Sequence, residues 1–212
     1  AIGLSSPGLA NTTNACIEVM PGRLPGLENF NWSEFTNEKI FVLNDAHAAL
    51  MAEARFGIAK NLKFVVMLTL GTGVGGGILI DGKLYQGMGQ MAGHLGHTTV
   101  DALDPNKDVT NIPGSLEDAI GNLSIQKRSN GKFETTWDLV SAYEKGDPLA
   151  TEIWLTSIKK LAASIASFIN ILSPELIIIG GGISKADELL LKPLNEYREQ
   201  FECRPGGKQI PV

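Results

Sequence analysis

Two glycine-rich segments are the first features of this sequence that could do chemistry. Residues 71–77 read Gly-Thr-Gly-Val-Gly-Gly-Gly after an apolar run, and the triplet at residues 180–182 follows a second apolar run. Glycine exposes bare backbone, and successive backbone amides form concave sites for anions such as phosphates. Both segments are therefore candidates for binding a phosphorylated ligand, with a tight turn or bulge as the alternative in each place.

The spacing of Gly71, Gly73 and Gly76 satisfies the pattern GxGxxG of dinucleotide-binding proteins. That fingerprint needs a helix to begin at the loop and an acidic residue about 20 positions later. Here the hairpin signal Asp81-Gly82 follows, and residues 90–98 hold no Asp or Glu. No Gly-Lys-Ser/Thr follows the glycines, as a P-loop would require. The sequence argues against both motifs and favours a phosphate-binding loop between two strands.

Asn44 and Asp45 stand where an apolar strand ends and a helix is expected to begin. On physical grounds alone, capping of the helix is the simpler interpretation for this pair. In α/β proteins, however, ligands bind beyond the carboxyl ends of strands, where a carboxylate is well placed to act as a base. His47, one turn further on, is expected at the surface or at the edge of the core.

A second group of polar residues, His94, His97 and Glu117, lies further along the chain. The two histidines are three positions apart, so a short helix would place both on one face. Glu117 is expected in the first turn of a helix, where a carboxylate is favourable. No thiol is near, so we do not expect a zinc site. The acidic residues of the loop between these groups are Asp101, Asp104 and Asp108.

Composition excludes several classes of protein. With 212 residues, 43% hydrophobic and 19% charged, the chain is typical of a globular protein. Its net charge of -5 and the lack of a basic run make nucleic acid an unlikely partner for this chain. Cys16 and Cys203 form no disulfide framework, so the cytoplasm is the expected location. The longest apolar stretch, around residues 161–172, is shorter than the ~20 residues that span a bilayer, so no membrane segment is expected.

Strands and helices alternate along the chain, which predicts an α/β fold with a mostly central sheet. The three tryptophans, at positions 32, 137 and 154, are expected in the core or at its edge. Ser184 is expected to cap the last helix. The predicted strands are residues 40–43, 63–70, 78–80 paired with 83–85, and 176–179, and the predicted helices are residues 46–60, 148–172 and 185–201.

Residues 70–97, LGTGVGGGILIDGKLYQGMGQMAGHLGH, resemble the signature of the ROK family (repressor, open reading frame, kinase), which comprises sugar kinases and related repressors. The resemblance implies a two-lobed, actin-like ATPase fold of the ribonuclease H-like type. On that basis residues 1–44 would be the end of the N-terminal lobe and residues 45–212 the C-terminal lobe, in a protein that also has an N-terminal phosphate loop and a closing helix. Further likeness lies in IGLSSPG (2–8), NDAHAALMAE (44–53), GSLE (114–117) and residues 177–183.

The resemblance also implies roles for individual residues. Asp45 would be the general base that takes the proton from a sugar hydroxyl as it attacks the γ-phosphate of ATP, with Mg²⁺ neutralising charge. The sugar-binding residues implied are Gly8, Asn44, Asp45, His94, His97 and Glu117, and those implied for phosphate and nucleotide are Gly71, Thr72, Gly73, Gly75, Gly181 and Gly182.

Two departures from the family pattern limit these expectations. His94 stands where the family often has Glu, which leaves the hydroxyl preference and the kinase activity open. The zinc loop of the family, Cys-x-Cys-Gly-x-x-Gly-Cys, is matched by Asp108, Thr110, Asn111, Gly114 and Ser115, so no zinc and no metal ligand is expected.

The overall expectation is an ATP-dependent kinase of a hexose or an N-acetylhexosamine, forming a homodimer. Without the first phosphate loop, these residues alone would be inactive or nearly so. A sugar-responsive ROK repressor and a non-catalytic sugar-binding module are the alternatives.

Overall fold

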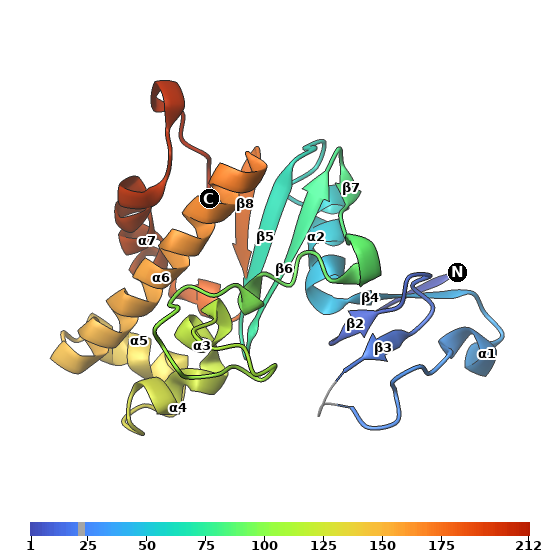
Figure 1. Cartoon of the computed structure of the whole chain (residues 1–212), viewed down its shortest axis with the longest axis horizontal. Helices are drawn as coiled ribbons and strands as arrows, with labels where there is room; N and C mark the ends of the chain where they lie inside the picture. Colours follow the sequence, from blue (N-terminus) through green and yellow to red (C-terminus); the bar gives the residue numbers. More distant parts are fainter. Residues whose placement is uncertain (21–23) are drawn as a thin grey trace.

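The structure is a computed structural model that describes residues 1–20 and 24–212. Its N-terminal part holds two small sheets, and its larger part is built on one four-stranded sheet (Figure 1). The strands are β1 (Ile2–Ser6), β2 (Leu9–Ala10), β3 (Ile17–Val19), β4 (Ile40–Asn44), β5 (Val65–Leu70), β6 (Val74–Ile80), β7 (Lys83–Leu84) and β8 (Leu176–Gly180). The α-helices are α1 (Trp32–Thr36), α2 (Asp45–Phe56), α3 (Leu116–Ile120), α4 (Ile125–Arg128), α5 (Thr136–Glu144), α6 (Pro148–Leu172) and α7 (Glu188–Phe201).

In the N-terminal part, β1 and β4 pair in parallel, with Ile2 opposite Ile40 and Ser6 opposite Asn44. Strands β2 and β3 form a short antiparallel pair beside them. The two parallel strands therefore end side by side, where α2 begins. A small core seals this part of the chain and comprises Ala10, Ile17, Met20, Ile40 and Val42.

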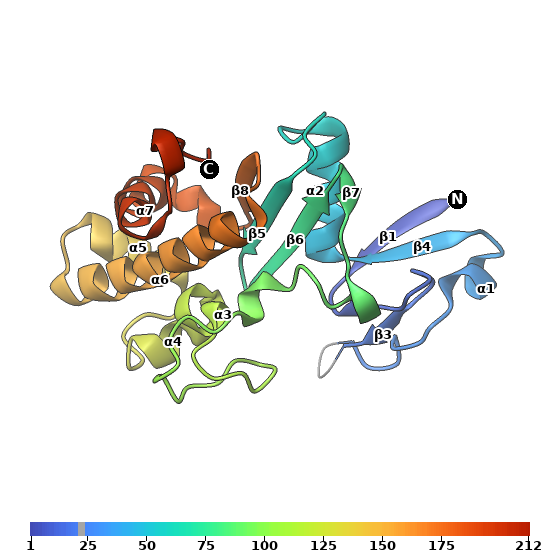
Figure 2. The same cartoon turned by 45° about the horizontal axis from the view of Figure 1, so that its top comes forward.

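The four-stranded sheet has the order β7-β6-β5-β8, with β5 antiparallel to β6 and parallel to β8. Alternate residues of β5 point to opposite faces. Val66 and Leu68 join the large core that contains α6, whereas Val65 and Met67 join the cluster against α2. The two helices thus cover opposite faces of the sheet (Figure 2). The apolar run around β5 is confirmed as a strand buried on both sides.

Helix α6 is the longest element and matches the predicted range. Asp147 caps it by accepting a hydrogen bond from the Ala150 amide at 2.8 Å, and Pro148 occupies its first turn. By length and composition this helix of 25 residues is apolar enough to cross a membrane, so the apolar stretch is longer than the residues 161–172 identified from the sequence. Half of its most apolar window is buried in the protein, with Trp154 wholly inaccessible.

The glycines of residues 75–77 belong to β6, and the loop itself is only residues 71–73. Gly75 pairs with Thr69 of β5, and a Cβ on Gly75 would come within 2.9 Å of the Ala46 Cβ in α2. Absence of a side chain therefore lets the start of α2 pack against β6. Close packing of α2 against β6 is therefore a structural reason for glycine at position 75, separate from any role in binding phosphate.

The last helix begins later than predicted. Residues Ile183–Ala186 form a separate 3-10 helix, and Asp187, with a φ of 47°, breaks the chain direction before α7. Ser184 is not the cap of α7, because its hydroxyl donates to the Gly181 carbonyl at 2.8 Å instead. The glycine triplet therefore leads into a short turn of 3-10 helix rather than into a long helix.

Candidate functional site

Asn44 and Asp45 divide two tasks at the junction of β4 and α2. The buried Asn44 caps the helix, since its Oδ1 accepts hydrogen bonds from the amides of Ala46 at 3.0 Å and His47 at 3.3 Å. Its Nδ2 donates to the Gly8 carbonyl at 2.9 Å, which joins two of the predicted sugar-binding residues. Asp45 is exposed and accepts only from the adjacent Ala46 amide among the described residues. Its carboxylate is therefore left available for a ligand.

His47 and His94 face one another beside this junction. His47 is 1% exposed, and its Nε2 lies 3.1 Å from the Ala92 carbonyl, so the expectation of a position at the surface or at the edge of the core was wrong. The two rings lie 5.4 Å apart between centroids. Burial, reinforced by the charges of His47 and His97, lowers the pKa of His94 to about 4, and burial also lowers the pKa of His47. Both rings are neutral at pH 7.

His97 bonds Asp108, whereas the Nε2 of His94 has no partner in the described residues, so the two histidines do not act as a pair. A 3-10 helix spans Leu95–His97, and His94 precedes it. The Nδ1 of His97 lies 2.9 Å from Oδ2 of Asp108, whereas the Nε2 of His94 is buried without a hydrogen-bond partner among the described residues. A buried nitrogen without a hydrogen-bond partner costs stability unless a ligand or a water molecule bonds to it.

Glu117 is placed where the sequence predicted, in the first turn of α3, which Ser115 caps. The side chain is 7% exposed. Its Oε2 accepts a hydrogen bond from the Val74 amide at 3.0 Å, and its Oε1 is buried with no partner in the part of the chain that the structure describes. A side chain at Gly73 would collide with this carboxylate. Glu117 therefore lies directly against the glycine loop and keeps one acceptor free.

The loop of residues 71–73 presents its amides rather than its carbonyls. The carbonyls of Gly71 and Thr72 accept hydrogen bonds from Asn122 at 3.0 Å and Leu123 at 2.9 Å. The amides of Thr72 and Gly73 have no hydrogen-bond partner within residues 1–20 and 24–212. Free amides held in fixed positions form an anion-binding loop.

A cavity of about 370 Å³ opens beside this loop, between Gly71 and Thr72 on one side and Gly182 on the other. Gly181, with a φ of 93°, turns the chain after β8 but does not line the cavity. The remaining lining was not identified from the sequence and comprises Asn122, Thr135, Thr136, Trp137, Val140, Ile183 and Ala186.

Two lining residues of this cavity have free binding groups. Trp137 is 69% exposed, so its expected place in the core or at the core edge was wrong. Trp154 is a core residue, and its Nε1 donates to the Leu189 carbonyl at 2.9 Å. The hydroxyl of Thr136 is buried without a hydrogen-bond partner in the described residues. No local pattern marks these residues, because the start of α5 is far from the glycine loop in sequence.

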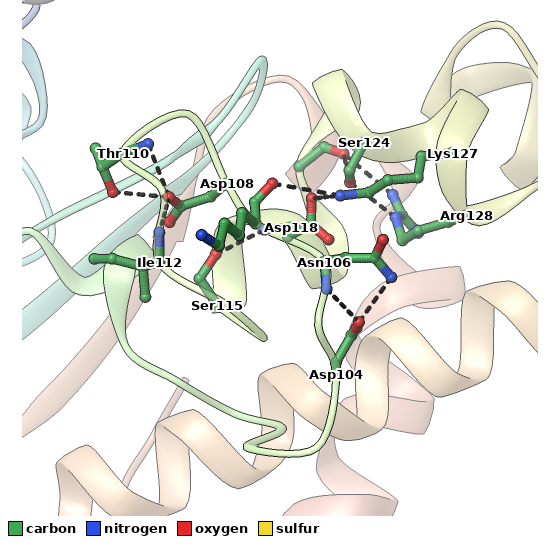
Figure 3. A network of polar contacts seen from close by, with 12 residues as sticks. Asp104, Asn106, Asp108, Thr110, Ile112, Ser115, Asp118, Ser124, Lys127 and Arg128 are labelled. Carbon is green, nitrogen blue, oxygen red and sulfur yellow. Dashed lines mark hydrogen bonds and ion pairs between the residues drawn. The ribbon is translucent and has the colours of Figure 1, made fainter.

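His97, Asp108 and Glu117 each offer one metal-ligand atom, and these atoms lie within 4.8 Å of one another. Figure 3 shows the contacts of Asp108 with Thr110 and Ile112. Its Oδ1 accepts from the Thr110 amide at 2.8 Å, the Thr110 hydroxyl at 2.7 Å and the Ile112 amide at 3.1 Å, while Oδ2 faces His97. A carboxylate has about four lone-pair sites, and these are taken.

These hydrogen bonds also decide the charge of Asp108. Its burial raises the pKa, but hydrogen bonds from His97, Thr110, Ile112 and Ser115 outweigh burial and lower the pKa to about 2. The group is therefore a carboxylate with no free acceptor, in a set that contains no thiolate. These residues do not fit the zinc implied by the ROK resemblance, since structural zinc sites are built mainly from thiolates and imidazoles.

Several known proteins are similar to this chain in sequence. The sequence is 32% identical to the glucokinase of Thermotoga maritima, covering 92% of this chain and 68% of the relative. It is 35% identical to the N-acetylmannosamine kinase of Vibrio cholerae, covering 84% and 61%. It is also 27% identical to the xylose repressor of Caldicellulosiruptor bescii, covering 94% and 54%. The chain thus spans between about half and two thirds of the length of these relatives.

Solved structures have the same fold. The crystal structure of a ROK hexokinase from Thermus thermophilus superposes with a TM-score of 0.86 at 27% identity, covering 100% of this chain and 71% of the other. The fold is therefore the mixed α/β fold of ROK sugar kinases within the actin-like ATPases. The profile of the ROK family matches residues 1–208. Nearly the whole length of this chain matches that profile, and the chain belongs to the ROK family.

Proposed function

We propose that this chain forms most of an ATP-dependent sugar kinase, which transfers the γ-phosphate of ATP to a hydroxyl of a hexose or an N-acetylhexosamine. One observation carries the proposal. The exposed carboxylate of Asp45, the free acceptor of Glu117 and the free amides of Thr72 and Gly73 come from separate segments that meet around the same two elements, α2 and β6.

The sugar side of the site is rich in groups that accept hydrogen bonds. Glu117 keeps Oε1 free, and neutral His94 keeps its Nε2 without a partner in the described residues. Asn44 is held between Gly8 and the start of α2, so it fixes the wall next to Asp45. Sugar hydroxyls are the natural donors for such acceptors. The ROK family often has Glu at the position of His94. A glutamate only accepts hydrogen bonds, whereas a neutral histidine ring donates at one nitrogen and accepts at the other.

Asp45 is the proposed general base. As the sugar oxygen bonds to the γ-phosphorus, the bond from that phosphorus to the β,γ-bridging oxygen breaks, ADP leaves, and the hydroxyl proton passes to the Asp45 carboxylate. Base catalysis of this kind contributes about 10²–10⁴-fold. The rest of phosphoryl transfer is positioning and charge neutralisation.

The nucleotide side is supported by the glycine loop and the adjoining cavity. The amides of Thr72 and Gly73 are suited to phosphate oxygens, and the cavity of about 370 Å³ falls in the size range of small-molecule pockets. Adenosine would lie against Gly182 and the exposed ring of Trp137. Mg²⁺, when bound with ATP, supplies neutralisation of the phosphate charge, and it binds mainly through phosphates and water, so no residue here is assigned to it.

Turnover of glucose and N-acetylmannosamine, measured by coupled release of ADP in the full-length protein, tests the proposal. Asp45→Asn should reduce turnover at least 100-fold while leaving sugar affinity nearly unchanged. Asp81→Asn is the matched control, because Asp81 is an exposed turn residue with a φ of 52°, which Asn tolerates well. Turnover retained in Asp45→Asn would mean that this carboxylate is not the base.

A sugar-responsive repressor is the second candidate, favoured by the likeness to a protein named as a xylose repressor. The accessible Asp45 carboxylate and the nucleotide-sized cavity beside the glycine loop favour the kinase. Sugar binding without any phosphorylation, together with specific binding of duplex DNA by the full-length protein, would favour the repressor.

The division into residues 1–44 and 45–212, a homodimer and a cytoplasmic location complete the proposal. Light scattering of the purified protein at micromolar concentration tests the dimer.

A further inference from the structure

We infer that Asp108 takes the place of a structural metal in this site and is a positioning residue: its carboxylate folds the loop of residues 101–114 and holds His97 in the tautomer with a bare Nε2. The inference rests on the proposed function in one respect, that the Nε2 of His97 serves a sugar hydroxyl. The structural half of the inference is independent of any activity.

The loop folds around the Asp108 side chain. The described loop contains no helix or strand, yet the side chain of Asp108 is wholly inaccessible. Its Oδ1 gathers two amides and one hydroxyl from residues two to four positions ahead, which closes a tight turn. The Asp108 amide donates to the Ile112 carbonyl at 3.0 Å, and the Gly114 amide donates to the Asn106 carbonyl at 2.9 Å. One buried carboxylate therefore organises the loop that precedes α3.

The same carboxylate reaches across the loop to His97. Oδ2 of Asp108 lies 2.9 Å from Nδ1 of His97. An ionised carboxylate only accepts hydrogen bonds, so Nδ1 must carry the proton. The hydroxyl of Thr110 lies 3.4 Å from the same nitrogen, but its proton goes to Asp108 at 2.7 Å. A neutral ring protonated at Nδ1 presents a lone pair at Nε2.

The consequence for a ligand is specific. A ligand can reach His97, since 27% of its side chain is accessible. A Glu117 carboxylate oxygen belongs to the same cluster, within 4.8 Å, and its Oε1 has no partner in the described part of the chain. A lone pair at Nε2 of His97 and the free Oε1 of Glu117 would suit a sugar, because the hydroxyls of its ring donate hydrogen bonds. Asp108 controls one of the two acceptors through the tautomer of His97.

Nitrogen NMR of the protein labelled with ¹⁵N-histidine tests the structural half without any variant. We expect the protonated-type signal at Nδ1 of His97 and the unprotonated-type signal at Nε2. Zinc content measured by mass spectrometry should be far below one atom per chain. Protonation of His97 at Nε2, or one zinc per chain that survives dialysis against a chelator, would overturn the inference.

Asp108→Asn tests the functional half, with glucose and N-acetylmannosamine as the probes. The amide can donate to Nδ1, so His97 should shift toward the Nε2-protonated form. The affinity for the sugar should fall about 2- to 13-fold, as expected for the loss of one neutral hydrogen bond. ATP affinity should stay within about twofold, because Asp108 does not line the nucleotide cavity.

Asp104→Asn is the control, since Asp104 lies in the same loop but bonds Asn106 instead of His97. It should keep the tautomer and the sugar affinity. Thr110→Val removes the hydroxyl that lies 2.7 Å from Asp108 and 3.4 Å from Nδ1 of His97, but it keeps the contact between Asp108 and His97, so it should keep the tautomer. If Asp108→Asn fails to fold, the nitrogen NMR of the wild-type protein still decides the tautomer. An unchanged tautomer with unchanged sugar affinity in Asp108→Asn would refute the inference. If the wild-type protein binds neither sugar, the proposed function fails for these substrates, while the tautomer and zinc content still decide the structural role of Asp108.

Discussion

Replacement of Glu117 by Gln separates ligand binding from folding more sharply than any other change at this site. Oε2 of Glu117 accepts from the buried Val74 amide at 3.0 Å, whereas Oε1 has no partner in the described residues. Glutamine has nearly the same shape. Its single carbonyl oxygen can keep the bond to Val74, which leaves the NH₂ group at the position of the free acceptor. The glycine loop is then preserved, and only the ability to accept a ligand hydroxyl is lost.

The magnitudes follow from this geometry. A hydrogen bond to a charged group contributes about 1.5–3 kcal/mol, which corresponds to about 10- to 150-fold in affinity. The free energy of unfolding should change by less than about 0.5 kcal/mol in Glu117→Gln. Glu117→Ala should instead cost about 1–3 kcal/mol of stability, because the Val74 amide loses its acceptor. Gly73 leaves no side chain near the space that the alanine variant opens.

Calorimetric titration with glucose or N-acetylmannosamine and urea denaturation measure the two quantities on the same preparations. We expect a large loss of sugar affinity with retained stability in Glu117→Gln, and loss of both in Glu117→Ala. Sugar affinity within twofold of the wild type in Glu117→Gln would refute the role of Oε1. Equal destabilisation by both variants would refute the assignment of the Val74 contact.

Two further outcomes follow from groups near the site. Burial lowers the pKa of His94 to about 4 from its usual 6.5, so between these pH values the unfolded chain binds a proton that the folded protein does not. The free energy of unfolding is therefore fully retained above pH 6.5 and decreases as pH falls toward 4. The loss of stability is up to about 3 kcal/mol, reduced by solvent contact. In urea denaturation, His94→Asn should remove most of this pH dependence and leave the part that the lowered pKa of His47 supplies. An unchanged dependence of stability on pH in His94→Asn would contradict the burial of a neutral ring. Trp137 is exposed at the cavity beside the glycine loop, so ADP should quench the tryptophan emission of the full-length protein. Trp137→Phe should abolish that quenching, whereas quenching that survives would place the nucleotide elsewhere.

The sequence was sufficient for the elements that are buried on regular patterns. Strand β5 is a continuous apolar run because both of its faces are covered, and α6 ends before Pro174 because proline disfavours helix in the residue before it. The start of α2 at Asp45 and the place of Glu117 in α3 were also predictable, because capping residues mark both helices.

Contacts between distant segments were not predictable in the same way. Trp137 lines a cavity with Gly71, and His97 bonds Asp108, but neither pair follows a helix or strand period. The late start of α7 arises from the positive φ of Asp187, which a non-glycine residue seldom adopts. Gly75 fitted a phosphate-loop pattern, whereas its place inside β6 depends on how closely α2 packs. The sugar and nucleotide roles of individual residues stay predictions.

The junction between β4 and α2 has a consequence for motion of the molecule. The strand ends at Asn44 and the helix begins at Asp45, so no loop residue separates them. Asn44 also bonds the carbonyl of Gly8, beyond the neighbouring strand β1. A rotation of the N-terminal strands is therefore transmitted directly to the first turn of α2, and the direction of the Asp45 carboxylate changes with it. Opening and closing of the two parts of the chain would align or misalign this group without any separate hinge.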